Sequence, residues 1–275
     1  MRARASLLGD YLRTRRDLVQ PEQVGLLREP NRRVPGLRRE EVAALAGISS
    51  EYYLRLEQGR DHQPSDQVLR CLTEALNLSA DESTYLHKLA RPSTRSADPL
   101  QQGGDAAVVR LLERRAGTPA FVADSNFDIV ASNAAADLLG AGALSAGRNR
   151  LVQVFSRRQH HPRWAQQAAE TVAMFRMHGN PDDHRYQEIV GMLSVRDDDF
   201  RQIWARHEVL SASSGTCIET VEPFGLVEFE WESLLIPGSD GLIVTTFHGA
   251  PGTPAMGVLA FVATQCADRQ AINAS

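Results

Sequence analysis

The segment formed by residues 37–60 constrains the fold more than any other part of the chain. Val42, Ala43 and Ala46 recur at the spacing of one helix face, and Gly47 follows where a turn with positive φ suits glycine best. A small residue such as Ala43 is needed where two helices cross steeply at short distance. The pattern predicts two short helices joined by a tight turn.

The second of these helices has a polar face of its own. Ser49 is placed to cap its first turn, and the apolar pair Tyr53 and Leu56 faces the first helix. The outward residues that follow the cap are Ser50, Glu51, Tyr52 and Arg55. An ordinary helical hairpin would also need a glycine turn, but cap, alanine and apolar spacing together favour a helix-turn-helix. In that motif the polar face enters the DNA major groove, so we expect Ser49 to Arg55 there, with the four outward residues reading base edges.

The charge distribution supports DNA contact in the first third of the chain. Residues 1–97 hold 16 Lys and Arg against 13 Asp and Glu, a balance of +3, and the remainder holds 14 against 21, a balance of −7, which together give the net −4. Arg39 opens the first helix of the pair, and Arg32 and Arg33 lie in the proline-rich connection before it. We expect these three arginines to contact DNA phosphates, the alternative being a solvated charged loop.

The length of 275 residues is enough for two domains. Apolar periodicity predicts five helices within residues 1–91, which form an all-α DNA-binding domain. A polar stretch rich in Pro, Ser and Gly at 92–105 predicts a linker, followed by a second domain at 106–265 and a tail at 266–275. Because the sequence has no apolar run of membrane-spanning length and no signal peptide, we expect a cytoplasmic protein.

The second domain combines strands and helices. Two β-prone runs at 120–124 and 127–132 flank a turn and predict a hairpin, and strands are predicted again at 217–221, 226–236 and 242–247. The run 226–232 alternates regularly, with glutamates on the face expected to be solvated. Helical periodicity lies between these groups, and a short helix is expected near 253–264. This order predicts an α+β, PAS-like domain with an antiparallel sheet.

The chain resembles a known family over nearly its whole length. The helix-turn-helix resembles the Cro/C1-type (XRE-like) repressors. The segments Arg33–Ala43, Tyr52–Arg60 and Pro64–Leu69 resemble the DNA-binding part of the MmyB-like transcription regulators. Motifs of the second half resemble the ligand-binding domain of that family: Ile129–Asn133, Trp164–Ala168, Asp182-Asp183, Phe200–Trp204 and His207–Val209. Glu208 stands where the family usually has aspartate.

The resemblance implies a lambda-repressor-like domain followed by a PAS-like pocket for a small apolar molecule, with a fatty acid as the family's precedent. Large apolar residues of the second domain are the candidates to line that pocket, although each could equally belong to the core: Phe121, Trp164, Met174, Phe175, Met192, Phe200, Trp204 and Phe229. One helix-turn-helix reads only a few base pairs, so a homodimer on double-stranded DNA is expected. The alternative is a second domain that serves only dimerisation or partner docking, without ligand.

Catalytic and metal signatures are missing from the sequence. The histidines have no metal-binding spacing, and Cys71, Cys217 and Cys266 form no pair of the C-x-x-C type. Nucleophile-elbow, P-loop and dinucleotide motifs do not occur. We therefore expect no enzyme activity, no metal and no cofactor besides a bound fatty acid or similar apolar ligand.

Overall fold

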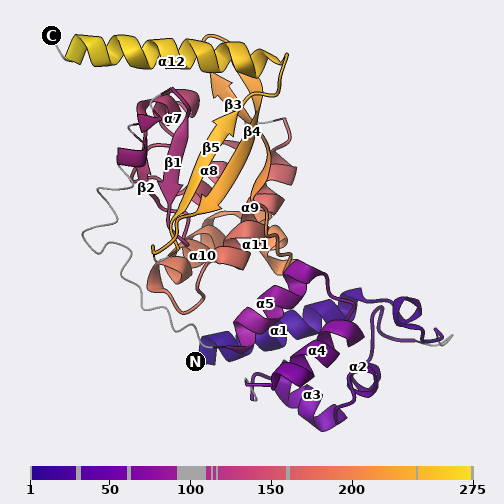
Figure 1. Ribbon diagram of the computed structural model, residues 1–275. Helices are drawn as coiled ribbons and strands as arrows, with labels where there is room; N and C mark the ends of the chain where they lie inside the picture. The colour runs from indigo at the N-terminus through magenta and orange to yellow at the C-terminus, as the bar shows by residue number, and fades with distance from the viewer. Residues whose placement is uncertain are drawn as a thin grey trace. The chain divides into compact units, whose positions relative to one another are not determined.

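The computed structural model describes residues 2–28, 32–60, 63–91, 110–112, 114–115, 117–158, 162–239 and 241–273. Within this described part, the secondary structure up to residue 90 is helical, and a five-stranded sheet with further helices follows (Figure 1). The predicted two-domain fold class, an all-α domain followed by an α+β domain, is therefore confirmed.

The first part contains α1 (Arg2–Leu18), a 3₁₀ turn (Pro21–Val24), α2 (Arg39–Leu45), α3 (Ser50–Glu57), α4 (Asp66–Ala75) and α5 (Ala80–Ala90). Serine side chains cap three of these helices: Ser49, Ser65 and Ser79 each accept a hydrogen bond from a first-turn N–H. The core lies between α1 and the helices around it, where Leu8 and Tyr53 are fully buried. Five predicted helices are thus present, and serine caps explain where α3, α4 and α5 begin.

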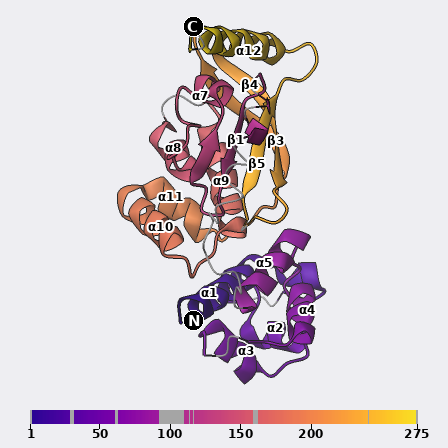
Figure 2. The same ribbon diagram turned by 60° about the vertical axis from the view of Figure 1, so that its left-hand side comes forward.

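The second part is built on one antiparallel sheet. Its strands are β1 (Ala120–Ala123), β2 (Ile129–Ser132), β3 (Ser214–Val221), β4 (Gly225–Leu235) and β5 (Ile243–His248), in the order β2-β1-β5-β4-β3 (Figure 2). Phe229 of β4 is opposite Cys217 of β3, and Trp231 is opposite Phe247 of β5. Val227 and Phe229 are buried, whereas the intervening glutamates 228 and 230 are exposed, as the alternation predicts.

The helices of the second part are α7 (Ala134–Leu139), α8 (Arg150–Ser156), α9 (Trp164–His178), α10 (His184–Arg196), α11 (Asp198–Ala205) and α12 (Pro254–Asn273). The main core lies between the buried sheet face and α7 and α12, and includes Phe121, Phe229 and Val262. A smaller cluster on the other face joins Leu112 to Val122 of β1.

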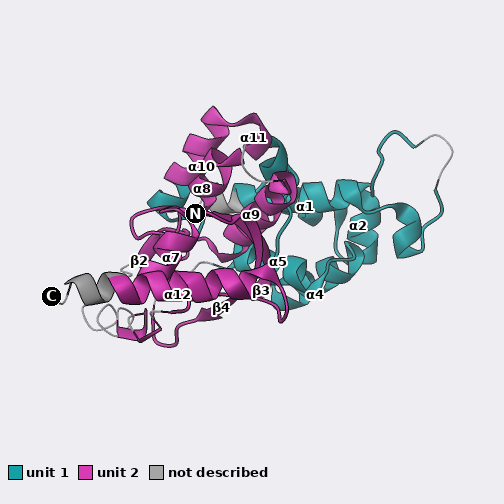
Figure 3. Ribbon diagram, turned by 90° about the horizontal axis from the view of Figure 1, so that it is seen from above, with its two compact units in different colours: residues 1–94, 180–187, 202–210 teal, residues 95–179, 188–201, 211–275 magenta. Residues whose placement is uncertain are grey.

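The chain divides into two compact units. One comprises residues 1–94, 180–187 and 202–210, and the other comprises residues 95–179, 188–201 and 211–275 (Figure 3). We refer to them as unit 1 and unit 2. Unit 1 contains the predicted DNA-binding helices, and unit 2 contains the whole sheet.

Several boundaries differ from those predicted. The last helix is longer than expected: α12 runs to Asn273 and buries Cys266, so residues predicted as a tail from 266 form its final turns. Helix α8 was not predicted, because its seven residues are too few for a clear period. The predicted linker at 92–105 and the first residues of the predicted second domain, 106–109, lie outside the described residues.

Candidate functional sites

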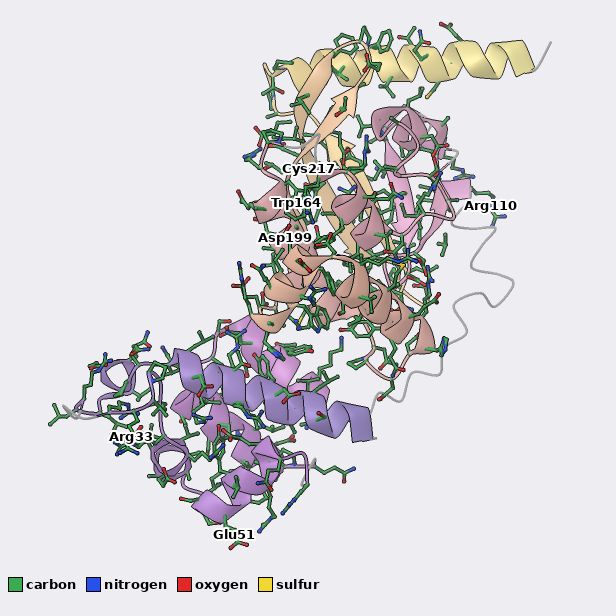
Figure 4. All side chains as sticks on the ribbon, turned by 180° about the vertical axis from the view of Figure 1, so that it is seen from behind. Arg33, Glu51, Arg110, Trp164, Asp199 and Cys217 are labelled. Carbon is green, nitrogen blue, oxygen red and sulfur yellow. The ribbon has the colours of Figure 1, made fainter. Side chains whose placement is uncertain are left out.

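The outward face of α3 carries the four residues predicted to read bases. The Ser49 hydroxyl accepts the N–H of Tyr52 at 3.1 Å and so sets the start of the helix. Glu51 exposes 83% of its side chain and lies at the outer surface of unit 1 (Figure 4). Arg55 lies 3.4 Å from Glu51 and stacks over the Tyr52 ring at 5.4 Å. An exposed arginine held by such weak contacts can turn toward a base at low cost.

A buried carboxylate anchors the C-terminal end of α3. Glu57 exposes 1% of its side chain and accepts hydrogen bonds from the Nε atoms of Arg16 and Arg39, both at 2.6 Å. Burial acts to raise the pKa of the Glu57 carboxyl, but the two arginine hydrogen bonds outweigh it and hold the pKa below its ordinary value. Since Arg16 belongs to α1 and Arg39 to α2, this network orients the reading helix in unit 1.

The three predicted phosphate contacts have different environments. Arg33 is exposed in the loop before α2 (Figure 4), and Arg39 exposes 45% of its side chain although its Nε is bonded to Glu57. Arg32 exposes only 2%, and it binds the Glu41 carboxylate and the Gly36 carbonyl. This burial contradicts the prediction for Arg32, whose guanidinium anchors the loop to α2 instead of facing outward.

Unit 2 contains a cavity between the sheet and α9. The space inside it that a water-sized group could occupy is about 120 Å³, and the cavity opens to solvent. Its lining residues are Phe121, Ala123, Asp124, Phe127, Arg150, Gln167, Glu170, Thr171, Met174, His178, Ala212, Thr216, Cys217, Trp231, Ser233, Ile243, Thr245 and Phe247. The exposed surface of this lining is mainly apolar, which suits a small ligand with a large apolar part.

Of the eight predicted pocket residues, Phe121 and Met174 line this cavity. Two of the predicted aromatic residues pack elsewhere: Phe200 and Trp164 both contact Phe155, and Trp164 donates its Nε1–H to the Val154 carbonyl. The other four predicted residues, Phe175, Met192, Trp204 and Phe229, do not line the cavity either; Phe175 packs on Phe127, Trp204 on Tyr186, and Phe229 is fully buried in the core. An apolar helix face alone cannot distinguish a cavity wall from the core.

The sequence contained a usable signal for some of the missed residues. Trp231 has the same parity along β4 as the buried Val227 and Phe229, and Phe247 is its cross-strand neighbour. Gly215 on β3 lets the Trp231 ring lie close, because a Cβ there would be only 2.9 Å from the ring. Strand alternation therefore identifies the face of β4 on which Trp231 lies, but it does not separate Trp231 at the cavity from Phe229 in the core.

Several residues that line the cavity are polar. Arg150 of α8 reaches the buried Glu219 at 3.2 Å, and Glu219 also lies 3.8 Å from Arg157. The hydroxyls of Ser233 and Thr245 are hydrogen bonded at 2.7 Å. Burial raises the pKa of the Cys217 thiol to about 12, so this cavity-lining sulfur stays protonated at neutral pH.

In the part of the chain that the structure describes, no three His, Cys, Asp or Glu side chains are grouped so as to hold a metal ion. No described helix is long and apolar enough to cross a membrane. The predicted absence of a metal and of catalysis stays a prediction.

An exposed helix-turn-helix and a separate domain with a ligand-sized cavity define a DNA-binding transcription regulator with a ligand-binding domain. A helix-turn-helix domain model matches residues 7–86, and the MmyB-like transcription regulator ligand binding domain matches residues 105–260, more than half of the chain. The chain therefore belongs to the family of MmyB-like transcription regulators.

Comparisons with individual proteins add little to this family assignment. No curated protein matches the chain. A solved structure described as an RNA-binding Light-Oxygen-Voltage receptor is similar with a TM-score of 0.25 and 13% identity. The similarity covers 85% of this chain and 62% of the other, so the chain spans less than two thirds of that structure's length.

Proposed function

We propose that the protein binds a two-fold DNA site as a homodimer through the outward face of α3, and that a small apolar, fatty-acid-like ligand in the unit 2 cavity controls this binding. The exposed, capped face formed by Ser50, Glu51, Tyr52 and Arg55 is the observation that supports DNA reading most directly. Each helix-turn-helix covers only one half-site, which is why two copies are required.

We expect Arg55→Ala to weaken binding to the preferred DNA sequence by about 5- to 150-fold, because one bidentate base contact discriminates by about 1–3 kcal/mol. The preferred sequence is first selected from a random DNA library, and fluorescence anisotropy then compares it with scrambled DNA. Binding to scrambled DNA should change little. An equal loss on both DNAs would contradict base reading by Arg55.

Arg33→Ala is the matched test of a phosphate contact, because this exposed residue lies outside α2 and α3. We expect it to weaken binding to selected and scrambled DNA alike and to reduce the slope of log K against log salt by about one. The salt series is measured with the same anisotropy assay. An unchanged slope would show that Arg33 does not contact phosphate.

The cavity supports a ligand with an apolar body and a polar head. Phe121, Met174 and Phe247 offer apolar surface, and Arg150 offers a guanidinium beside them. A fatty acid would place its chain against the first group and its carboxylate near Arg150. Such a ligand can change DNA affinity only if it binds two arrangements of the protein unequally.

Met174→Trp is expected to abolish ligand binding, because the larger side chain fills the cavity from α9. Native mass spectrometry of protein from its own host identifies a bound molecule, and thermal unfolding with medium- and long-chain fatty acids measures affinity. A ligand at 100 times its Kd stabilises the wild type by about 2.7 kcal/mol, and this gain should vanish in the variant. Met192→Trp is the control, because Met192 does not line the cavity; equal loss in both variants would contradict the site.

The alternative is a unit 2 that only dimerises or docks a partner. A protein that carries no small molecule from its host and shows no thermal shift with the lipid series would favour this alternative. We also propose that the protein is not an enzyme, since no sequence motif supports catalysis.

A further inference from the structure

The outer surface of α12 and the neighbouring β3–β4 turn is apolar. On the helix, Met256 is 52% exposed and Phe261 is 37% exposed. On the turn, Phe224 is 46% exposed, and its ring lies 5.1 Å from that of Phe261 in an edge arrangement. Leu226, the second residue of β4, is 52% exposed. Proteins that act as monomers rarely expose a contiguous patch of this kind. We call these four residues and the exposed side of α12 the α12 surface.

This helix is firmly attached to unit 2 by its opposite side. The buried residues Ala255, Val258, Val262 and Cys266 follow one helical face and belong to the main core. Figure 1 shows α12 running across one end of the sheet. The α12 surface is therefore a fixed, preformed face of unit 2.

No close contact with the described residues requires a glycine at position 257. A Cβ added there would meet no atom within 4 Å, and glycine inside a helix is less stable than alanine. Along the same exposed side, Ala260, Thr264 and Ala267 follow Gly257 at spacings of three, four and three residues. A second helix could therefore approach the backbone of α12 closely, in the heptad manner.

The absence of charge indicates what covers this surface. Residues 249–267 contain no Asp, Glu, Lys or Arg, although 23% of the whole chain is charged. Across a two-fold axis the same patch meets itself, so charged residues near the axis face like charges. The other face of the sheet, with Glu230 and Glu232 exposed on β4, would bring carboxylates of two copies together. The α12 surface has no charged residue in this range, so two copies can meet there without like-charge repulsion.

We propose that the α12 surface is the interface through which a second copy of this chain docks, with α12 packed against its two-fold mate. The interface rests on the proposed function, because reading a two-fold DNA site requires a dimer. It goes further than the proposed function, because it places the dimer contact in unit 2, whereas the helices proposed to read DNA belong to unit 1.

Sedimentation velocity of the full-length protein over a range of concentrations tests the interface. Met256→Glu and Gly257→Glu each place a carboxylate in the interface, where it meets the same carboxylate of the second copy. Each variant should therefore raise the dimer Kd at least tenfold. Both sites are exposed, so the unfolding temperature should stay close to that of the wild type. Leu234→Glu is the control, since Leu234 is 67% exposed on β4 outside the α12 surface and its change should leave the Kd unaltered. A monomeric wild type, or variants as dimeric as the control, would overturn the interface.

Fluorescence anisotropy with an isolated half-site and with the complete two-fold site tests the interface and the proposed DNA reading separately. Met256→Glu should bind an isolated half-site as well as the wild type does, and should lose at least tenfold in affinity on the two-fold site. A wild type that dimerises through α12 but binds neither DNA supports the interface and overturns the proposed DNA reading. Tight two-fold binding by a monomeric Met256→Glu variant would overturn the role of the interface.

Discussion

Glu57→Ala is expected to destabilise unit 1 by about 3–5 kcal/mol, because the buried guanidinium of Arg16 loses the carboxylate that accepts its Nε–H and keeps only the contacts with Asp17 and the Leu37 carbonyl. Arg16 exposes 7% of its side chain, so solvent cannot replace the lost partner. Arg39, at 45% exposure, adds little to the loss because water screens it. Urea unfolding measures the loss, and hydrogen exchange of the α1 and α3 amides locates it in unit 1.

The control for this prediction is Glu51→Gln on the same helix. Glu51 exposes 83% of its side chain, and its pair with Arg55 is worth about 0.3–0.5 kcal/mol. If Glu57→Ala cost no more than Glu51→Gln, the network would not anchor α3. DNA affinity should follow stability, because a displaced α3 no longer presents its reading face.

The same carboxylate predicts a pH dependence. The pKa of Glu57 is lowered on folding from an ordinary value of 4.5, so its contribution to stability is fully present above that value. The contribution is lost as the pH falls below 4.5 and through the folded-state pKa. Glu57→Gln, which cannot titrate, should show a shallower loss of stability in this window than the wild type. Parallel pH profiles of the two proteins would exclude Glu57 as the cause.

Gly9→Ala is the second substitution with a large expected effect. It should lower the free energy of unfolding by about 3 kcal/mol, which is the upper end of the usual cost of overpacking a core. Gly9 lies in α1, and a Cβ there would be 2.3 Å from the Glu57 carbonyl oxygen and 2.8 Å from its carbon. Because these are backbone atoms, α1 and α3 must separate to accommodate one methyl group. Thermal unfolding of the full-length variant measures this loss.

Gly191→Ala is the matched control, since Gly191 also lies in a helix and a Cβ there would meet nothing within 4 Å. Alanine is the better helix former, so this variant should gain about 0.5–1 kcal/mol. Opposite signs for the two substitutions would demonstrate close α1–α3 contact. Gains of similar size in both would contradict it.

The two helices of the helix-turn-helix could be located from sequence because their signals are local. Ser49 caps α3, Gly47 has the positive φ of 65° that the turn requires, and Tyr53 and Leu56 are buried as their spacing indicates. The cavity was predicted less well, since only Phe121 and Met174 of the eight expected residues line it. Aromatic residues such as Phe200 follow the same helical period whether they meet a cavity or another side chain.

By itself the sequence determined the two-domain organisation, the face of α3 that is turned outward and the alternation of β4, because each depends on neighbours within a few residues. Only the tertiary structure decided that Glu57 joins three helices, that Arg32 is buried against Glu41, and that Trp231 borders a cavity. These facts depend on contacts between segments far apart in the chain. The free energy of a buried charge or an empty space arises from such contacts, which local periodicity does not specify.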